Sequence, residues 1–488
     1  MLAWIHYITP KNKMLIIIRR LAQSTLIITF VLSTSITSAQ SRKVYNAIHS
    51  GIPWMDNQGK TLSAHGANIV RENGKYYLFG EYKTDSANVF NGFSCYSSTD
   101  LCNWKFESMA LPVQPAGKLG PNRVGERPKV MKCPTTGEYI MYMHVDTLGY
   151  KDQFVGYATS PKITGPYIFQ GALLFEGNPI RQWDMGAFQD RDGSGYILVH
   201  GGEIYKLAND YKSLKEKVNE TMASGFESPV IFRKDSLYYF LGSNLTSWER
   251  NDNYYFTAKS LQGPWVKRGL LAPVGSLTWN SQCTFVLPIE GTKDTTYMYM
   301  GDRWSFPKQN SAATYVWQPL IVDGTSLSIP VYLEAWNVDV STGMASPTLL
   351  EGTTIESVNM HRIKYSGNWQ QDTLSSRSSD VKGASFSIQF QGTQVGFYGV
   401  ARPNGGYALV KLRNSNGQTV FSSIVDMYCK YPISTLKFLS PRLSKDDYTL
   451  TVTVMGELGN WSDKRKRLYG STGYMVSLNK IVIDQNDH

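Results

Sequence analysis

Cysteine is scarce in this chain and follows no metal-binding pattern. The 488 residues contain five cysteines, Cys95, Cys102, Cys133, Cys283 and Cys429. No spacing among them resembles a metal site, so the sequence does not predict a cysteine-based metal domain. Cys95 and Cys102 flank a short turn and could pair in an oxidising compartment, with a free buried thiol as the alternative for each. The odd number leaves at least one cysteine free or bonded between chains.

Long apolar runs and long helical periods are also absent. The apolar run 26–32 follows Arg19 and Arg20 and is too short to span a bilayer. Small residues just before position 40 suit cleavage by a signal peptidase. We therefore predict that residues 1–39 are a signal peptide and that the protein is secreted or periplasmic, with a membrane anchor as the alternative. No cysteine stands at the cleavage point, so lipid attachment is not indicated.

The sequence has no long runs of charge of one sign. The formal net charge is +10, and removal of residues 1–39 takes away four Lys or Arg and no acid, which leaves +6. The excess is diffuse apart from the basic run 464–467. A basic surface turn explains that run better than nucleic-acid binding does.

A tyrosine-rich strand pattern recurs five times, at residues 74–80, 137–143, 195–200, 237–242 and 296–301. An earlier apolar stretch precedes each copy, and a polar residue stands at its head: His65, Glu126, Asp184, Glu227 and Gln282. Five such units predict an all-β chain with a five-bladed β-propeller over residues 40–345. Because the first strand of each blade lines the axis of a propeller, we expect the five polar side chains to converge on one pocket.

The composition changes after the repeats end. From about residue 355 the chain alternates polar and apolar residues, as in 384–390, 395–400 and 448–454. This pattern predicts a C-terminal β-sandwich over residues 357–488, joined to the propeller by a linker at 346–356. The sandwich is expected either to bind carbohydrate or to buttress the propeller, and fold analogy alone does not choose between them.

Three of the five polar heads are carboxylic acids, Glu126, Asp184 and Glu227. Carboxylates gathered around one axis repel one another, so we expect at least one to hold a proton near neutral pH. A protonated carboxylic acid beside an ionised partner is what the cleavage of a glycosidic bond requires. For any one of these acids, a role in a turn or at the surface is the ordinary explanation. Three acids at equivalent positions make that explanation weaker.

Residues 45–345 resemble glycoside hydrolase family 43. The resemblance rests on the hairpin 96–104, on Asp184 with the following 188–193, and on Glu227 in its Glu-Ser-Pro context. It implies that Glu227 is the general acid, that Asp184 modulates the pKa of that acid, and that the anomeric centre is inverted. The aspartate base of the family has no counterpart here, because residues 63–66 read Ser-Ala-His-Gly.

In this respect the chain is similar to the exo-β-1,3-galactanase subgroup of the family, which also lacks the usual base. Glu126 in Glu-Arg-Pro-Lys-Val and Gln282 in Ser-Gln-Cys-Thr-Phe-Val match its motifs. The resemblance implies that Gln282 holds the attacking water and that Glu126 aids catalysis or sugar binding. A neutral amide is a very weak base, so Gln282 is expected to orient water through its carbonyl or as the imidic tautomer, with Glu126 as another acceptor of the proton.

Further substrate contacts are predicted at Glu81, Tyr150, Thr246 and Trp248, and at His65, for which a structural role in the central channel is equally open. No cofactor is expected; family propellers sometimes hold an axial calcium ion, but no ligand set in this sequence demands one.

The predicted function is that of a secreted exo-acting hydrolase that releases galactose from the non-reducing end of β-1,3-galactan in plant arabinogalactan. Neither a nucleic acid nor a membrane anchor of the mature chain is expected. The alternatives are a β-galactofuranosidase or α-L-arabinofuranosidase on the same fold, and a glycan-binding propeller without activity.

Overall fold

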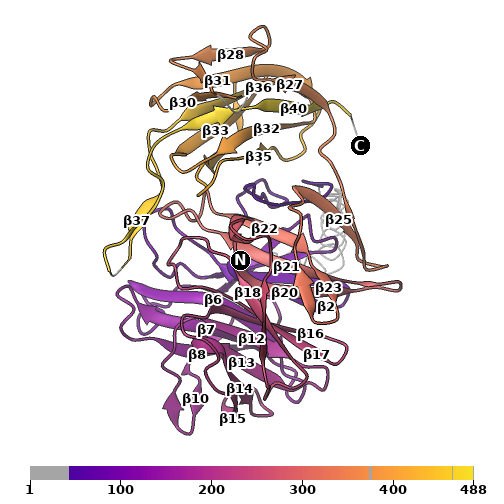
Figure 1. Cartoon of the computed structure of the whole chain (residues 1–488), viewed down its shortest axis with the longest axis vertical. Helices are drawn as coiled ribbons and strands as arrows, with labels where there is room; N and C mark the ends of the chain where they lie inside the picture. Colours follow the sequence, from indigo (N-terminus) through magenta and orange to yellow (C-terminus); the bar gives the residue numbers. More distant parts are fainter. Residues whose placement is uncertain (1–42, 373–375, 464, 487–488) are drawn as a thin grey trace, which may run out of the picture. The chain divides into compact units, whose positions relative to one another are not determined.

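The computed structural model describes residues 43–372, 376–463 and 465–486, and their secondary structure is almost entirely β (Figure 1). Besides strands, these residues form only a short 3-10 turn, His200–Gly202, and the four-residue helix α2, Leu277–Asn280. The prediction of an all-β chain is therefore confirmed. The predicted signal peptide lies outside the described residues. No helix within them is long and apolar enough to cross a membrane.

Five largely antiparallel sheets follow one another along the chain. The first contains β2 (His65–Glu72), β3 (Lys75–Glu81), β4 (Phe93–Ser98) and β5 (Lys105–Leu111). The second contains β6 (Arg123–Lys132), β7 (Tyr139–Thr147), β8 (Phe154–Ser160) and β9 (Ile168–Ala172). The third contains β12 (Met185–Gln189), β13 (Gly195–Val199), β14 (Glu203–Leu207) and β15 (Leu214–Asn219), and is extended by β10 (Leu174–Phe175) and β11 (Asn178–Pro179).

The remaining two sheets of this series have four and three strands. The fourth contains β16 (Glu227–Lys234), β17 (Leu237–Ser243), β18 (Tyr254–Ala258) and β19 (Val266–Leu270). The fifth contains β20 (Gln282–Glu290), β21 (Thr295–Arg303) and β22 (Thr314–Pro319). Apart from β10 and β11, which extend the third sheet beside β15 through a parallel pair, the strands of each sheet occur in chain order, because short turns join neighbours.

The first strands of the five sheets contact one another in a closed cycle. Strand β2 contacts β6, β6 contacts β12, β12 contacts β16, β16 contacts β20, and β20 returns to β2. Glycine permits part of this close approach: a Cβ on Gly186 would lie 2.0 Å from the carbonyl oxygen of Pro229 on the next first strand. The cycle places the heads of all five first strands around one centre.

A three-stranded sheet connects residues near the start of the described chain with residues beyond the fifth sheet. It contains β1 (Ile48–His49), β25 (Ala335–Asp339) and β26 (Met344–Pro347), with β1 paired to β25. A hairpin of β23 (Ile321–Asp323) and β24 (Ser326–Ser328) precedes it. This pairing fixes the two ends of the five-sheet region to each other.

The C-terminal residues form two larger sheets. One contains β27 (Thr353–Glu356), β40 (Lys480–Asp484), β32 (Gln394–Ala401) and β35 (Ile433–Leu439). The other contains β28 (Ile363–Ser366), β31 (Ser385–Gly392), β36 (Asp446–Val454), β33 (Tyr407–Asn414) and β34 (Thr419–Asp426). Burial alternates along β31, and the rings of Phe386 and Phe397 join the two sheets at 5.7 Å. Strand β27 occupies residues that the sequence assigns to the linker.

Smaller pairings complete the C-terminal region: β29 (Gln370–Gln371), β30 (Arg377–Ser379) and β39 (Val476–Leu478) form one sheet, and β37 (Asn460–Ser462) with β38 (Leu468–Gly470) forms a hairpin. All five cysteines are free.

Candidate active site

A β-bulge near the start of β6 aims two consecutive side chains at the centre of the ring. The register of β6 against β7 shifts between Glu126 and Lys129, and Arg127 has a φ of 51°. Neighbouring residues of a regular strand face opposite sides, but a bulge turns the additional residue. Glu126 and Arg127 therefore both reach polar partners of the site.

Arg127 connects most of the predicted residues to one another. It is only 8% exposed. Its Nε forms an ion pair with Asp184, its Nη2 donates to Oε1 of Gln282 at 2.9 Å, and its backbone N–H donates to Oε1 of Glu81 at 2.9 Å. The planar guanidinium thus fixes Asp184 and Gln282, which its fork geometry allows, and the backbone of the same residue fixes Glu81.

Asp184 and Glu227 lie next to each other across two neighbouring first strands. The backbone N–H of Ser228 donates to Oδ2 of Asp184 at 2.5 Å, and Ser228 directly follows Glu227 on β16. Burial raises the pKa of Glu227 well above its usual range, and the carboxylates of Asp184 and Glu126 raise it further, against the opposing charge of Arg127. Glu227 is therefore the protonated acid of the group.

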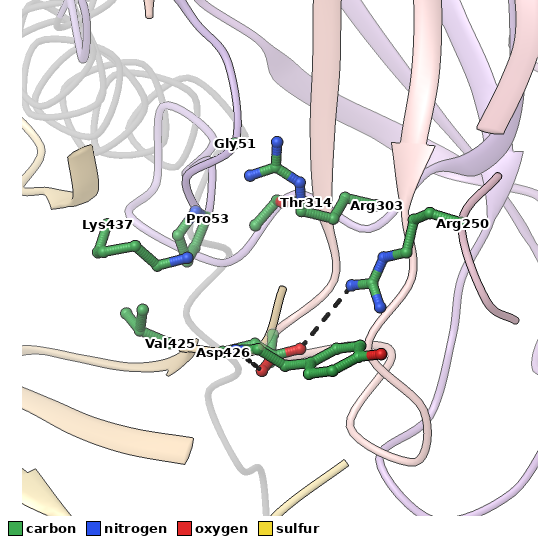
Figure 2. Close-up of a pocket in the computed structure, with 10 residues that line it drawn as sticks. Gly51, Pro53, Arg250, Arg303, Thr314, Val425, Asp426 and Lys437 are labelled. Atoms are coloured by element: carbon green, nitrogen blue, oxygen red, sulfur yellow. Dashed lines mark hydrogen bonds and ion pairs between the residues drawn. The ribbon is translucent and has the colours of Figure 1, made fainter. Parts of the chain in front are cut away.

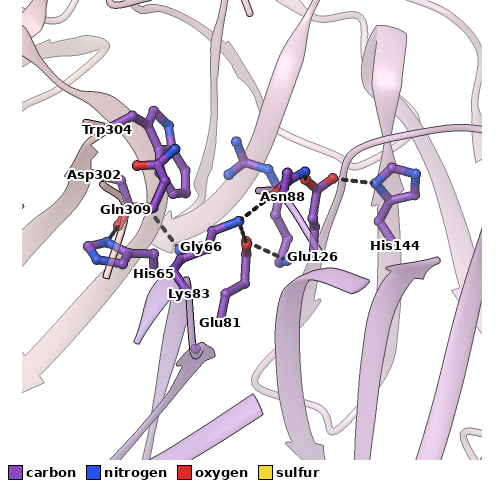
Figure 3. Close-up of polar contacts among 12 residues, drawn as sticks. His65, Gly66, Glu81, Lys83, Asn88, Glu126, His144, Asp302, Trp304 and Gln309 are labelled. Carbon is purple, nitrogen blue, oxygen red and sulfur yellow. Dashed lines mark hydrogen bonds and ion pairs between the residues drawn. The ribbon is translucent and has the colours of Figure 1, made fainter. Parts of the chain in front are cut away.

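Glu126, unlike Glu227, is surrounded by groups that favour its ionised form. Its Oε1 accepts hydrogen bonds from Asn88 Nδ2 and from the hydroxyl of Tyr150, both at 2.8 Å, and its Oε2 lies 3.0 Å from Nδ1 of His144 (Figure 3). Burial acts to raise the pKa of Glu126, but the hydrogen bond and the charge of His144 outweigh burial and hold that pKa below its usual range. Glu126 is therefore ionised.

His144 carries a positive charge because both of its ring nitrogens face carboxylates. Nδ1 is 3.0 Å from Glu126 and Nε2 is 3.3 Å from Oδ2 of Asp146. A ring that donates from both nitrogens must be the imidazolium. Burial lowers the pKa of His144, but the bonds to Asp146 and Glu126 raise it to about 9.

Gln282 is held at both the oxygen and the nitrogen of its amide. Its Oε1 accepts from Arg127 Nη2 and from the indole Nε1 of Trp304, both at 2.9 Å, and its Nε2 donates to Oγ of Ser243 at 2.9 Å. Two N–H donors face the same atom, so that atom must be the oxygen, and the orientation of the amide is fixed. The carbonyl oxygen already accepts two hydrogen bonds.

Glu81 lies at the site but is engaged by the protein itself. Besides the Arg127 N–H, it forms an ion pair with Lys83. Burial raises the pKa of Glu81; Lys83 lowers that pKa and Glu126 raises it. The ammonium of Lys83 also lies 5.1 Å from the ring of Trp248 and 5.3 Å from that of Trp304, within the range of a cation–π contact.

The other predicted contact residues divide into two groups. Tyr150 bonds Glu126, and Trp248 is half-buried beside the Trp304 ring at 5.1 Å, so both lie at the site. Thr246 donates to the carbonyl of Glu249 at 2.6 Å and accepts from Asn251 at 2.6 Å. The hydroxyl of Thr246 therefore shapes the loop between β17 and β18.

His65 has a structural role next to the site. It is fully buried, its Nδ1 lies 3.0 Å from Oδ1 of Asp302, and its ring stacks on Tyr315 at 4.6 Å. Oδ2 of Asp302 accepts from the N–H of Gly66 at 3.0 Å. These bonds tie β2 to β21 and leave His65 no surface on which a sugar could lie.

The centre of the ring holds the amine of Lys129. Its Nζ donates to the carbonyl oxygens of Gly66 at 2.5 Å and Ala67 at 3.1 Å. Burial lowers the pKa of Lys129 to about 7, and Arg127 lowers it too. Backbone carbonyls are ligands of hard cations, and here the side-chain nitrogen of Lys129 donates to them. Across the residues that the structure describes, no group of three or more His, Cys, Asp or Glu is placed to hold a metal.

Comparison with known proteins agrees with this geometry. The family described as glycosyl hydrolases family 43 matches residues 60–276. A candidate exo-β-1,3-galactanase from Bifidobacterium bifidum s17 is 38% identical, with a TM-score of 0.54 over 57% of this chain and 95% of that chain. The chain belongs to glycoside hydrolase family 43. It is therefore a glycoside hydrolase.

Two further solved structures extend the comparison. The exo-β-1,3-galactanase from Phanerochaete chrysosporium, solved with galactose, is 28% identical to this family 43 enzyme, with a TM-score of 0.67 over 90% of this chain and all of that one. An exo-β-1,3-galactanase from Clostridium thermocellum, 23% identical with a TM-score of 0.58 over 84% of this chain and all of that one, shows the fold alone. No curated protein sequence matches the chain.

Sequence reasoning missed Arg127, His144 and Lys83. Arg127 is adjacent to Glu126, so regular strand alternation would turn it away from the centre. His144 and Asp146 have the spacing of one strand face, which is a signal in the sequence. That signal gains meaning only when β7 pairs with β6 and places His144 opposite Glu126.

Proposed function

We propose that this hydrolase releases galactose from the non-reducing end of β-1,3-galactan, with inversion at the anomeric carbon. The observation that carries the proposal is that Arg127 binds both Asp184 and Gln282 beside Glu227, whose pKa burial and Asp184 raise, in a chain similar to exo-β-1,3-galactanases. A variant of the Phanerochaete chrysosporium enzyme was solved with β-1,3-galactotriose, which supports a galactan substrate.

The architecture we propose is a five-bladed β-propeller followed by a β-sandwich. The cyclic contacts of β2, β6, β12, β16 and β20 support five blades. The two facing C-terminal sheets support the sandwich. We propose 40–345 as the propeller and 357–488 as the sandwich, with 346–356 as the linker except for β27, which pairs with β40 of the sandwich. We propose 1–39 as a signal peptide for a secreted or periplasmic enzyme that acts on plant-type arabinogalactan.

Glu227 serves as general acid in this mechanism. Its raised pKa keeps the carboxyl protonated at neutral pH, and it gives that proton to the oxygen of the leaving sugar. Asp184 keeps this proton in place through its charge, and Arg127 and the Ser228 N–H hold Asp184 in position.

Gln282 positions the attacking water with its N–H group. Its oxygen already accepts from Arg127 and Trp304, so only the second Nε2 hydrogen is left to contact a water. The imidic tautomer would place a proton on the oxygen that faces those two donors, which disfavours it. Gln282 thus orients the oxygen of the water and does not remove its proton.

Glu126 is the ionised carboxylate we assign to receive the proton of the water, directly or through a second water. His144 keeps Glu126 charged before the reaction. A carboxylate with a low pKa is a weak base, so its transfer is expected to occur late, after the sugar has become positively charged.

Product analysis tests the proposed function. The enzyme is expected to release galactose from β-1,3-galactobiose, and NMR during the first turnovers should show the α-anomer. Aryl α-L-arabinofuranosides and β-D-galactofuranosides are the comparison substrates. Activity on these furanosides with none on galactobiose would overturn the proposal, and so would initial release of β-galactose.

A further inference from the structure

A small cavity whose lining includes none of Glu126, Asp184 and Glu227 lies between the five-sheet region and the C-terminal sheets (Figure 2). The five-sheet region contributes Arg250, Arg303 and Thr314, and the C-terminal region contributes Val425, Asp426 and Lys437. About 10 Å³ is open to the centre of a water-sized sphere. That space suits one water or one monatomic ion and excludes a sugar or a phosphate.

The lining carries more positive than negative charge. Arg250, Arg303 and Lys437 face the cavity together with one acid, Asp426. Arg250 is 1% exposed and Lys437 is 3% exposed. Buried cations normally have a charged partner, since an unpaired buried charge is costly.

The existing contacts compensate this charge only in part, since Nη1 of Arg250 lies 3.8 Å from Oε1 of the buried Glu249. Arg303 donates to the carbonyls of Asn280 at 3.1 Å and Trp279 at 3.0 Å, which are neutral. Asp426 lies 4.0 Å from Arg250 and accepts from the Ser305 hydroxyl at 2.9 Å. Its carboxylate is therefore already engaged.

Lys437 has neither a hydrogen bond nor an ion pair among the described residues, and Nε of Arg250 is buried without a partner. In Figure 2 the Lys437 amine points toward the space between Pro53 and Val425. Arg250, whose Nε is unpartnered, and Lys437, whose amine binds no described residue, thus both line this cavity.

We propose that this cavity binds a single small inorganic anion of the size and charge of chloride. The anion would accept hydrogen bonds from Lys437 and would lie in the field of Arg250 and Arg303, which removes the charge imbalance. Because the donors come from both regions, the bound anion holds the C-terminal sheets against the five-sheet region. It takes no part in the reaction.

Bromide provides a direct test with the full-length protein. Crystals grown or soaked in sodium bromide should show an anomalous peak in the cavity next to Lys437. In solution, the melting temperature at constant ionic strength should rise when chloride replaces gluconate, saturably and by on the order of 1 °C for each tenfold increase above the dissociation constant.

Lys437→Met should abolish the chloride dependence, and Lys215→Met, which alters an exposed lysine of β15, should retain it. Absence of an anomalous peak in the wild-type cavity would overturn the proposal even if Lys437→Met failed to fold. A peak without any difference between chloride and gluconate would mean binding at crystal concentration only, and would overturn it too.

Discussion

Two chemically similar residues of this site, Glu126 and Glu227, carry opposite protonation states. Glu126 faces the imidazolium of His144, which favours its charged form. Glu227 is half-buried near Asp184, and desolvation and the charge of Asp184 favour its neutral form. When the surroundings move the pKa values of two carboxyl groups apart, the group with the higher pKa is the one that can act as the general acid.

Glu227→Gln should lower kcat on β-1,3-galactobiose by about 10²- to 10⁴-fold, because the amide has no proton to donate. Hydrolysis of an aryl β-galactoside with a good leaving group should fall much less, since such a group leaves without a proton. Steady-state rates on the two substrates measure the difference. An equal loss of rate on both substrates would show that Glu227 is not the general acid.

Glu126→Ala tests the proton acceptor separately. Without the carboxylate, hydrolysis should fall by about 10²-fold or more, and added azide should restore turnover because it attacks without losing a proton. The product should be the α-galactosyl azide, detected by NMR or mass spectrometry. The same variant of Glu227 serves as the control, and azide rescue of that variant alone would contradict the assignment.

His144 should make stability depend on pH above neutrality. Its pKa in the folded chain is about 9, above its ordinary value of about 6.5. The stabilisation is therefore complete below about pH 6.5 and is lost as pH rises through 9, on the order of 3 kcal/mol in total.

His144→Gln should flatten the decrease in stability between these two pH values, as followed by urea unfolding. His361→Gln, at an exposed position, is the matched control and should keep the wild-type slope. An unchanged slope in His144→Gln would show that His144 is not charged in the folded chain.

At the scale of the element, the first strands do the positioning. Each brings its polar head to the centre, and bulges after His65, Glu126 and Glu227 change the direction of the next side chain. Close packing of neighbouring first strands then determines how far apart the heads lie. A disturbance between two of these strands should therefore reach the catalytic groups.

Gly186→Ala should be strongly destabilising, by about 2–4 kcal/mol, because the new methyl group would meet the Pro229 carbonyl on β16 and push the strands apart. Gly149→Ala is the control, because its Cβ would have only ordinary contacts, the nearest at 3.9 Å. Thermal or urea unfolding measures both. Equal stability of the two variants would show that β12 and β16 tolerate separation.

At the scale of the whole molecule, polar bonds join the five-sheet region to the C-terminal region. Glu249, buried in the loop after β17, accepts from the hydroxyl of Tyr428 at 2.7 Å and from the Gly470 N–H at 3.3 Å. The hydroxyl of Tyr407 donates to the carbonyl of Ser305 at 3.0 Å. Ser305 and Glu249 follow strands β21 and β17, so these bonds act close to residues of the site.

Tyr428→Phe should cost about 1.5–3 kcal/mol of stability, since it removes a hydrogen bond to a buried carboxylate. Tyr474→Phe, at a residue that is 43% exposed, should change stability by less than about 0.5 kcal/mol. Urea unfolding of both variants gives the comparison. If Tyr428→Phe left the stability unchanged, the hydrogen bond between Tyr428 and Glu249 would contribute nothing to the stability of the protein.

The amino-acid sequence alone determined the all-β class, the family, and the five polar residues at the strand heads, because strand alternation and local motifs are properties of short segments. Only the tertiary structure decided which way Arg127 points, that His144 is charged, and that the Gln282 oxygen is already occupied. The partners Arg127 and Gln282 are 155 residues apart, and a contact of that kind exists only after the sheets have closed into a ring. Charge and hydrogen-bond capacity depend on such neighbours, which no local pattern contains.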